Sequence, residues 1–230
     1  MTTTFAFVFA RGGSKGLPRK NILPICGIPL LAHSIKTARE IRDVDRIFVS
    51  TDCDEISTVA LQYGAEVIPR PSELASETAS EWLAWQHAIN YVVESGHTFD
   101  RFLSLPATAP MRIHDDVQLC LDALQDDIDF VITMTPSHRS PWFNMVSADK
   151  DSKVKLVGGD VHVTRRQDSP SCFDITTVAY VSRPHFILNS SSIWDGTVVG
   201  VEVPRNRSID IDDNFDFSIA RFLMEVDNHV

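Results

Sequence analysis

A cluster of glycine and basic residues follows the first apolar run of the chain, residues 5–10. Between positions 11 and 20 it holds three glycines and four cations: Gly12, Gly13, Gly16, Arg11, Lys15, Arg19 and Lys20. Glycine lets backbone amides approach a ligand closely, and cations balance the charge of phosphates. A solvated surface turn is the alternative, but this combination directly after an apolar strand favours a polyphosphate site. The spacing matches neither the Walker pattern nor the dinucleotide fingerprint.

A second candidate site is the alternating segment Ile209-Asp210-Ile211-Asp212. On a strand, successive side chains point to opposite faces, so both carboxylates would share one face and both isoleucines would enter the core. Two carboxylates on one face suit Mg2+ or Mn2+, which such sites bind together with substrate phosphate oxygens. The alternative is an acidic strand end that caps the last helix, with Asp213 as the capping residue.

The elements that would position these residues alternate between β-rich runs and helical patterns. Strands are predicted at 4–10, 46–50, 66–68, 102–105, 130–133, 178–181 and 198–203. Helices are predicted at 29–41, 54–63, from Ser80 onward, at 115–124 and at 213–226. This order is typical of an α/β fold, a mostly parallel sheet with helices on both faces. Ligands of such sheets bind beyond the carboxyl ends of the strands, which is where the glycine-rich loop begins.

The alternation fails at about residues 136–177, a polar stretch that holds Gly158-Gly159 and several arginines. Structureless loops longer than ~15 residues are uncommon in compact domains. We therefore expect an inserted, projecting arm here rather than a plain surface loop. The length of 230 residues and the absence of a linker or repeat predict that 1–230 otherwise form one domain.

The bulk composition excludes several classes of protein. A net charge of −10 is a poor match for nucleic-acid binding, which requires basic surface. The first apolar run is too short to span a membrane, and no basic residue precedes it as in a signal peptide. The four cysteines are scattered without zinc or redox spacing. We expect four reduced thiols in a cytoplasmic protein that binds neither membranes nor nucleic acids.

Four segments resemble the CMP-sialic acid synthetase family (acylneuraminate cytidylyltransferases), in the family's order and across nearly the whole chain. They are residues 10–21 (ARGGSKGLPRKN), 49–52 (VSTD), 70–80 (RPSELASETAS) and 208–212 (SIDID). The resemblance implies a Rossmann-like nucleotidyltransferase fold whose inserted arm serves dimerisation, and hence a homodimer. It also implies transfer of CMP from CTP to the anomeric hydroxyl of a nine-carbon, sialic-acid-like sugar acid, with release of pyrophosphate.

The resemblance further implies roles for individual residues. Catalysis would depend on Arg11, Lys20, Asp210 and Asp212, and the two aspartates would also hold Mg2+ or Mn2+. The nucleotide would be bound by Arg11, Gly12, Gly13, Ser14, Lys15, Asn21, Arg70 and Ser80. The sugar acid would be bound by Thr108, Arg112, Arg166, Gln167, Phe173 and Asp174. Of these, Arg166 would grip the sugar carboxylate with its two-pronged guanidinium. Asp212 and a metal-bound hydroxyl are both candidates for the general base.

The sequence departs from the family at two positions that concern the sugar. Pro106 stands where many members have a glutamine that contacts the sugar, and Asp174 stands where the family usually has an arginine. Together with Trp142-Phe143-Asn144, this pattern resembles the branch that acts on legionaminic acid, a diamino sugar acid. Two alternatives stay open: a 3-deoxy-manno-octulosonate (Kdo) cytidylyltransferase, which has a similar fold and loop, and a non-catalytic nucleotide-sensing relative.

Overall fold

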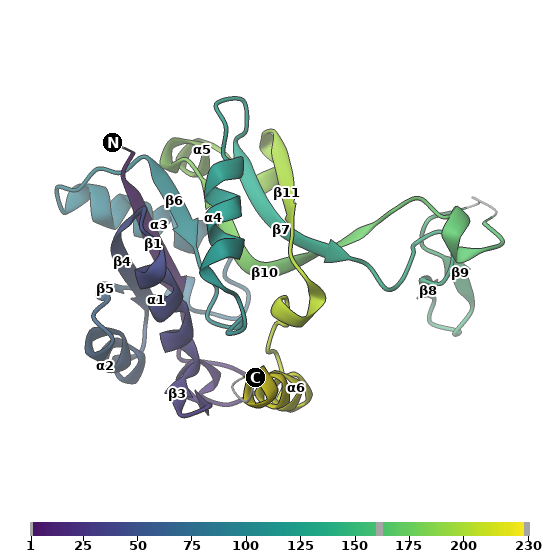
Figure 1. The fold of residues 1–230 in the computed structure, drawn as a ribbon, viewed down its shortest axis with the longest axis horizontal. Coiled ribbons are helices and arrows are strands. Elements are labelled where there is room, and N and C mark those ends of the chain that lie inside the picture. Colours follow the sequence, from purple (N-terminus) through teal and green to yellow (C-terminus); the bar gives the residue numbers. More distant parts are fainter. Residues whose placement is uncertain (1, 160–162, 228–230) are drawn as a thin grey trace.

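A seven-stranded sheet forms the centre of the protein (Figure 1). The computed structural model describes residues 2–159 and 163–227. The strands of this sheet are β1 (Thr4–Phe9), β4 (Val44–Thr51), β5 (Glu66–Pro69), β6 (Arg101–Ser104), β7 (Phe130–Pro136), β10 (Phe173–Ser182) and β11 (Val198–Glu202). They lie in the order β11-β7-β10-β6-β1-β4-β5. All neighbouring pairs are parallel except those of β10, which runs antiparallel to β6 and β7. The predicted mostly parallel α/β sheet is confirmed.

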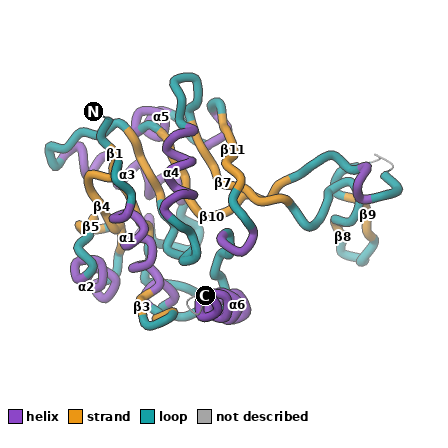
Figure 2. The backbone as a smooth tube through the Cα atoms, in the orientation of Figure 1, coloured by secondary structure: helices purple, strands orange, loops and turns teal. Residues whose placement is uncertain are grey.

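Helices cover both faces of this sheet (Figure 2). On one face lie α1 (Leu30–Glu40), α2 (Asp54–Gln62) and α4 (His114–Ala123). On the other lie α3 (Glu81–Glu94) and α5 (Pro184–Asn189). Short 3₁₀ helices connect the elements at Lys20–Ile22, Ser72–Leu74, Arg166–Asp168, Ile193–Asp195 and Arg205–Arg207. Among the described residues, no helix is long and apolar enough to cross a membrane.

Strand β1 shows how the sequence builds this three-layer core. Successive strand residues point to opposite faces, so Phe5 and Phe7 join the aromatic cluster under α3, where Trp85 packs on the strands. Ala6 and Val8 join the aliphatic cluster under α1 and α4. Because both faces are covered, the strand is apolar at every position from Phe5 to Phe9 rather than alternating. A continuous apolar strand of this kind ends sharply where the polar, glycine-rich loop begins.

A third, smaller core attaches the C-terminal helix α6 (Asn214–Asp227) to the loop that follows β1. This loop contains the short hairpin of β2 (Pro24–Ile25) and β3 (Ile28–Pro29). Ile211, which is fully buried, packs there against Leu17 and Ile25. The cluster therefore brings the acidic segment 208–212 against the glycine-rich loop, although nearly 200 positions separate them in the sequence.

The predicted arm projects from the sheet as an extension of β7 and β10 (Figures 1 and 2). A small two-stranded sheet of β8 (Val146–Ala148) and β9 (Val154–Leu156) lies at its outer end. Strand β10 begins at Phe173, five residues before the predicted start at 178. These extra residues pair with β7 beyond the body of the sheet, and a register shift separates Thr176 from Tyr180. Three of them are exposed, 173–175, so the buried-strand pattern was absent there.

The strand conformation considered for residues 209–212 is not present. These residues have no regular secondary structure and no strand pairing, and Ile211 N donates a backbone hydrogen bond to the carbonyl of Thr108 (2.9 Å). The alternative role of Asp213 is confirmed, because its Oδ1 accepts from the amides of Phe215 (2.7 Å) and Asp216 (3.0 Å) at the start of α6. Apolar–acidic alternation here reflects packing in the small core, by the buried Ile211 and the partly buried Ile209, rather than a strand ladder.

Candidate active site

A cleft of about 400 Å³ opens beyond the carboxyl ends of β1, β5 and β6, where ligands bind in sheets of this kind. It is lined by Phe9, Arg11, Ser14, Lys15, Gly16, Lys20, Asn21, Arg70, Leu74, Ser76, Glu77, Ala79, Ser80, Glu81, Ala84, Thr108 and Asp212. The lining holds four cations and three carboxylates. It is thus a locally basic surface in a chain of net charge −10. Most of the residues predicted to bind the nucleotide meet here.

The glycines of the first loop have packing roles that the sequence did not reveal. The amide of Gly12 donates to Asp52 Oδ1 (2.9 Å), and a Cβ there would lie 3.0 Å from the Cβ of Cys53. A Cβ on Gly16 would lie 2.4 Å from the carbonyl oxygen of Asp212, so only glycine admits the acidic segment this closely. Gly13 has open space around it. Gly12 and Gly13 are not among the residues that line the cleft.

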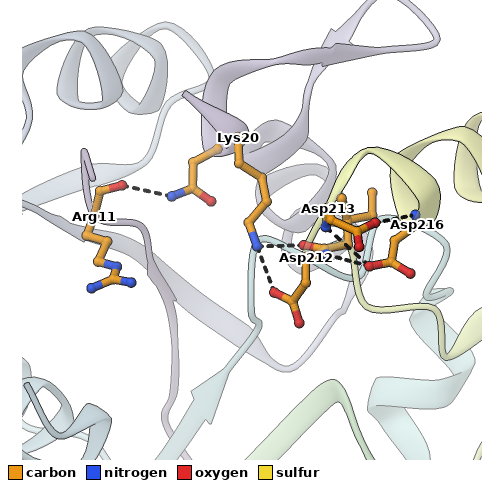
Figure 3. Close-up of polar contacts among 7 residues, drawn as sticks. Arg11, Lys20, Asp212, Asp213 and Asp216 are labelled. Carbon is orange, nitrogen blue, oxygen red and sulfur yellow. Dashed lines mark hydrogen bonds and ion pairs between the residues drawn. The ribbon is translucent and has the colours of Figure 1, made fainter. Parts of the chain in front are cut away.

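Each cation of the cleft has an oxygen partner in the same chain. Arg11 Nη1 donates to the carbonyl of Ser76 (2.9 Å), and Lys15 pairs with Glu77. Lys20 Nζ donates to the carbonyl of Ile211 (2.6 Å) and to Asp212 Oδ1 (2.9 Å), as Figure 3 shows. The Lys20 side chain is only 12% exposed, so these contacts hold it in the cleft wall. An incoming polyphosphate would replace these oxygen partners, whose positions show where the cleft favours negative charge.

Asn21 and Arg70 fix the two sides of the cleft. Asn21 Nδ2 donates to the carbonyl of Arg11 (3.0 Å) and so sets the start of the loop. Arg70 donates to Ser50 Oγ (3.1 Å) and to the Ser50 carbonyl (2.7 Å), and its guanidinium lies 5.5 Å from the ring centre of Phe9. Burial lowers the pKa of Arg70 to about 10, against the opposing charge of Asp52. Arg70 therefore stays charged at neutral pH and is held rigidly.

Ser80 is the N-cap residue of α3, although its side chain makes no capping hydrogen bond in the described structure. The next residue, Glu81, also lines the cleft, and sequence reasoning did not identify it. Desolvation raises the pKa of Glu81, and the nearby Arg70 guanidinium opposes this rise. The adjacent helix start was the one signal that could have drawn attention to Glu81, and it is a weak one, because first-turn carboxylates are common for reasons of helix stability alone.

The two aspartates of the acidic segment line two different cavities. Asp212 lines the nucleotide cleft beside Lys20. Asp210 lines a neighbouring pocket of about 720 Å³ together with Asp174 and Arg205. Desolvation raises the pKa of Asp210, and a hydrogen bond from the Thr108 hydroxyl opposes the shift. Thr108 lines the cleft and bonds to Asp210, and the charge of Asp212 adds to the rise in the pKa of Asp210, so the two carboxylates lie near each other.

These aspartates fit a divalent cation of the magnesium type. Asp210 Oδ1 is buried and has no hydrogen-bond partner among the described residues, which is costly unless a cation is bound there. No group of three or more His, Cys, Asp or Glu side chains in the described ranges forms a complete protein cage for a metal. Mg2+ does not need one, since it is bound through one or two carboxylates plus phosphate oxygens and water.

The residues predicted to bind the sugar acid are spread over several places in one chain. Thr108 lies in the nucleotide cleft and Asp174 in the pocket beside Asp210. Arg166, Gln167 and Phe173 line a separate pocket of about 590 Å³ on the arm. The structure therefore joins the nucleotide and metal residues and brings Asp174 to them, but it leaves Arg166, Gln167 and Phe173 apart from them within this chain.

Arg112 lies in none of these pockets. Its side chain is buried and donates to Ser34 Oγ (2.6 Å), to the Thr177 carbonyl (3.3 Å) and to the Pro106 carbonyl. Burial lowers its pKa to about 9, against the charges of Asp210 and Asp116. Its guanidinium therefore joins three elements to one another: α1, β10, and the loop that follows β6.

Comparisons with known proteins agree with this geometry. The cytidylyltransferase family profile matches residues 5–95. The chain is 32% identical to the CMP-N,N'-diacetyllegionaminic acid synthase of Campylobacter jejuni subsp. jejuni serotype O:2, over 99% of this chain and 97% of that protein. It is 30% identical to a pseudaminic acid cytidylyltransferase of Campylobacter jejuni subsp. jejuni serotype O:23/36, over 96% of this chain and 95% of that protein. The solved structure of a CMP:2-keto-3-deoxy-manno-octonic acid synthetase complexed with CTP shares the fold, with a TM-score of 0.72 and 17% identity. The match covers 98% of this chain and 100% of that chain.

Proposed function

We propose, because this chain belongs to the cytidylyltransferase family, that it transfers CMP from CTP to the anomeric hydroxyl of a nonulosonic, sialic-acid-like sugar acid. The other product is pyrophosphate. The observation that carries the proposal is the cleft itself, in which Arg11, Lys15, Lys20 and the carboxylate of Asp212 surround one space at the carboxyl end of the sheet. Phosphoryl transfer depends mainly on positioning and on electrostatic stabilisation, and these residues supply both.

In the proposed reaction the basic residues bind the triphosphate. Arg11 and Lys15 exchange the Ser76 carbonyl and Glu77 for phosphate oxygens, and Lys20 turns from Asp212 towards the phosphates. The sugar hydroxyl gives its proton to a base and its oxygen attacks the α-phosphorus, while the bond from the α-phosphorus to pyrophosphate breaks. These cations offset the charge that develops on the departing pyrophosphate. Asp210 and Asp212 would hold Mg2+ or Mn2+, which polarises phosphoryl oxygens when bound. Arg70 and Ser80 face the nucleoside end of the cleft.

For the acceptor we propose a diamino nonulosonate of the legionaminic type. The pocket that Asp210 shares with Asp174 adjoins the nucleotide cleft and is large enough for a sugar acid. Asp174 places a carboxylate in this pocket, and Pro106 offers no side-chain hydrogen bond on the loop after β6. A relative named for legionaminic acid at 32% identity supports this choice.

We also propose that the enzyme is a homodimer formed through the arm. Apolar side chains are exposed at the outer end of the arm, at Met145, Val146, Val154 and Val157. A second exposed apolar set lies on α6, at Phe215, Phe222 and Val226. Arg166 and Gln167 lie on the arm and away from the cleft of their own chain, so a partner's cleft is the place where they would meet a sugar carboxylate. We place the enzyme in the cytoplasm, where CTP is available.

A pyrophosphate-release assay tests the proposed function. Purified protein is incubated with CTP, Mg2+ and one of four sugar acids: N,N'-diacetyllegionaminate, pseudaminate, N-acetylneuraminate or Kdo. We expect release that depends on both CTP and a nonulosonate. Release with Kdo alone would favour the Kdo alternative, and no release with any acid would favour a non-catalytic relative.

A further inference from the structure

An ion pair joins two segments of the chain that lie 91 positions apart. Arg207 donates from Nε to Asp116 Oδ2 (2.9 Å) and from Nη2 to Asp116 Oδ1 (2.8 Å). This two-pronged arrangement fixes direction as well as distance. The Asp116 side chain is 3% exposed, whereas that of Arg207 is 29% exposed. Asp116 Oδ2 also accepts from the amide of Ile113 (3.2 Å), so the same carboxylate caps α4.

Each partner belongs to a segment that builds the metal site. Arg207 ends a 3₁₀ helix and is followed directly by residues 208–212, which carry both aspartates. Asp116 lies in the first turn of α4, which ends the loop that carries Thr108. Ile211 N donates to the carbonyl of Thr108 (2.9 Å), so the two segments run side by side. The ion pair therefore ties the acidic segment to the Thr108 loop just upstream of Asp210.

The other attachments of the acidic segment are of different kinds. Ile211 is buried in the small apolar core, which sets how deeply the segment lies. Asp216 Oδ2 accepts from the amides of Asp212 (3.0 Å) and Asp213 (3.2 Å), which fixes the downstream end to α6. Apolar packing tolerates sliding more readily than a bidentate ion pair does. Upstream, the Arg207–Asp116 pair supplies a second directional contact, which together with the Ile211–Thr108 backbone bond sets the register of Asp210 against Thr108.

Stability alone is a weak reason for such a pair. Replacing a buried ion pair by apolar side chains is often neutral or stabilising, and the better-attested use of buried ionic groups is to specify one arrangement. We propose that Arg207 and Asp116 are positioning residues, whose ion pair holds Asp210 and Asp212 at the placement beside Thr108 that a divalent cation requires. This inference rests on the metal role proposed above for the two aspartates.

Mn2+ titration followed by electron paramagnetic resonance tests the inference, with CTP present and no sugar acid. Arg207→Met should weaken Mn2+ binding about tenfold, the lower end of the loss seen when a partner that orients metal ligands is removed. The Mn2+ affinity of Arg207→Lys should lie between those of the wild type and Arg207→Met, since an ammonium keeps the charge without the planar fork. The matched control is Arg46→Met, because Arg46 makes the same fork to Glu66 (2.7 and 2.6 Å) on β4 and β5, away from the cleft.

Steady-state kinetics give a second readout. For Arg207→Met the half-saturating Mg2+ concentration should rise, while the KM for CTP at saturating Mg2+ stays near that of the wild type. Asp116→Asn keeps an acceptor for the Ile113 amide and should shift the Mg2+ requirement in the same direction. A general loss of folding would instead lower the active fraction without changing the metal requirement, and that pattern would contradict the positioning role.

The outcomes separate this inference from the proposed function. If Asp210→Asn abolishes Mn2+ binding and Arg207→Met leaves it unchanged, the positioning role is wrong and the metal site stands. The positioning role is also wrong if Arg46→Met weakens Mn2+ binding as much as Arg207→Met. If Asp210→Asn and Asp212→Asn also bind Mn2+ normally, the metal assignment fails and the inference fails with it.

Discussion

The nucleotide cleft and the arm are both polar, but they are held in different ways. In the cleft each predicted cation contacts an oxygen of its own chain, as Lys20 does with Asp212 and Arg70 with Ser50. In the arm, by contrast, large apolar side chains such as Val146 and Val154 are 56% and 63% exposed. One region is thus preorganised within a single chain, and the other presents surface that a partner would cover.

This difference separates two kinds of experiment. Changes in the cleft should affect chemistry without affecting assembly, because its contacts are internal. Changes at the outer end of the arm should affect assembly first and chemistry only through it. The variants below are ordered from the largest expected effect to the smallest.

The largest effects should come from Lys20→Ala and Arg11→Ala. Each removes a charge-assisted phosphate contact worth about 1.5–3 kcal/mol, so kcat/KM should fall about 10- to 150-fold or more. Lys36→Ala, which removes an exposed lysine of α1, is the control and should turn over normally. Normal turnover by both cleft variants, measured as pyrophosphate release, would mean that the phosphates bind elsewhere.

Gly16→Ala should come next. The added Cβ would lie 2.4 Å from the Asp212 carbonyl and must push the acidic segment away from the loop. A displacement of about 1 Å at an active site can cost ~100-fold in rate. Gly13→Ala adds the same methyl group where nothing lies within 4 Å, so it should keep most of the activity. Equal activity of the two variants, measured as pyrophosphate release, would contradict the close approach of the acidic segment to Gly16.

On the arm, the double change Val146→Asp and Val154→Asp should convert a dimer into monomers. Charged side chains in an apolar interface are strongly unfavourable, and multi-angle light scattering at micromolar concentration would show the change in mass. CTP binding should persist, while turnover of the sugar acid should fall. Leu61→Asp changes a side chain that is equally exposed (62%) on α2 and should leave the mass unaltered. A wild-type protein that is monomeric and fully active would refute the proposed dimer.

The smallest effect concerns the choice of sugar. We expect kcat/KM for N,N'-diacetyllegionaminate to exceed that for N-acetylneuraminate by about tenfold, a typical discrimination for a local change in one pocket. Asp174→Arg should narrow this ratio, since it restores the charge that the family usually has at this position. A wild-type preference for N-acetylneuraminate would overturn the sugar assignment and leave the nucleotide chemistry intact.

Sequence reasoning located most of the cleft-lining residues of the first loop because they are neighbours in the sequence. Glycines and cations between positions 11 and 20 follow a continuous apolar strand, and that strand alone places them at the ligand-binding edge of the sheet. The order of strands and helices was likewise readable from hydrophobic periodicity. Alternation alone did not show that residues 209–212 form no strand, because it arises from packing of Ile209 and Ile211 in a satellite core.

Contacts between distant segments could not be predicted from local sequence patterns. The buried position of Arg112 depends on α1, β10 and the loop after β6 meeting at one point. The Arg207–Asp116 pair spans 91 positions, and nothing in either local pattern distinguishes these residues from surface charges. The arm was recognised only because the alternation of strand and helix patterns stops there. An element that packs against few neighbours shows no hydrophobic periodicity in its sequence.

The most direct test of the proposed transfer is product formation from CTP and N,N'-diacetyllegionaminate, followed by 31P nuclear magnetic resonance with the wild-type protein and Asp212→Asn. We predict that the wild-type protein converts CTP into pyrophosphate and a CMP phosphodiester of the sugar acid in equal amounts. The variant should form neither product at a comparable rate. Pyrophosphate without a CMP sugar, or CTP left intact with every nonulosonate, would contradict the proposed transfer.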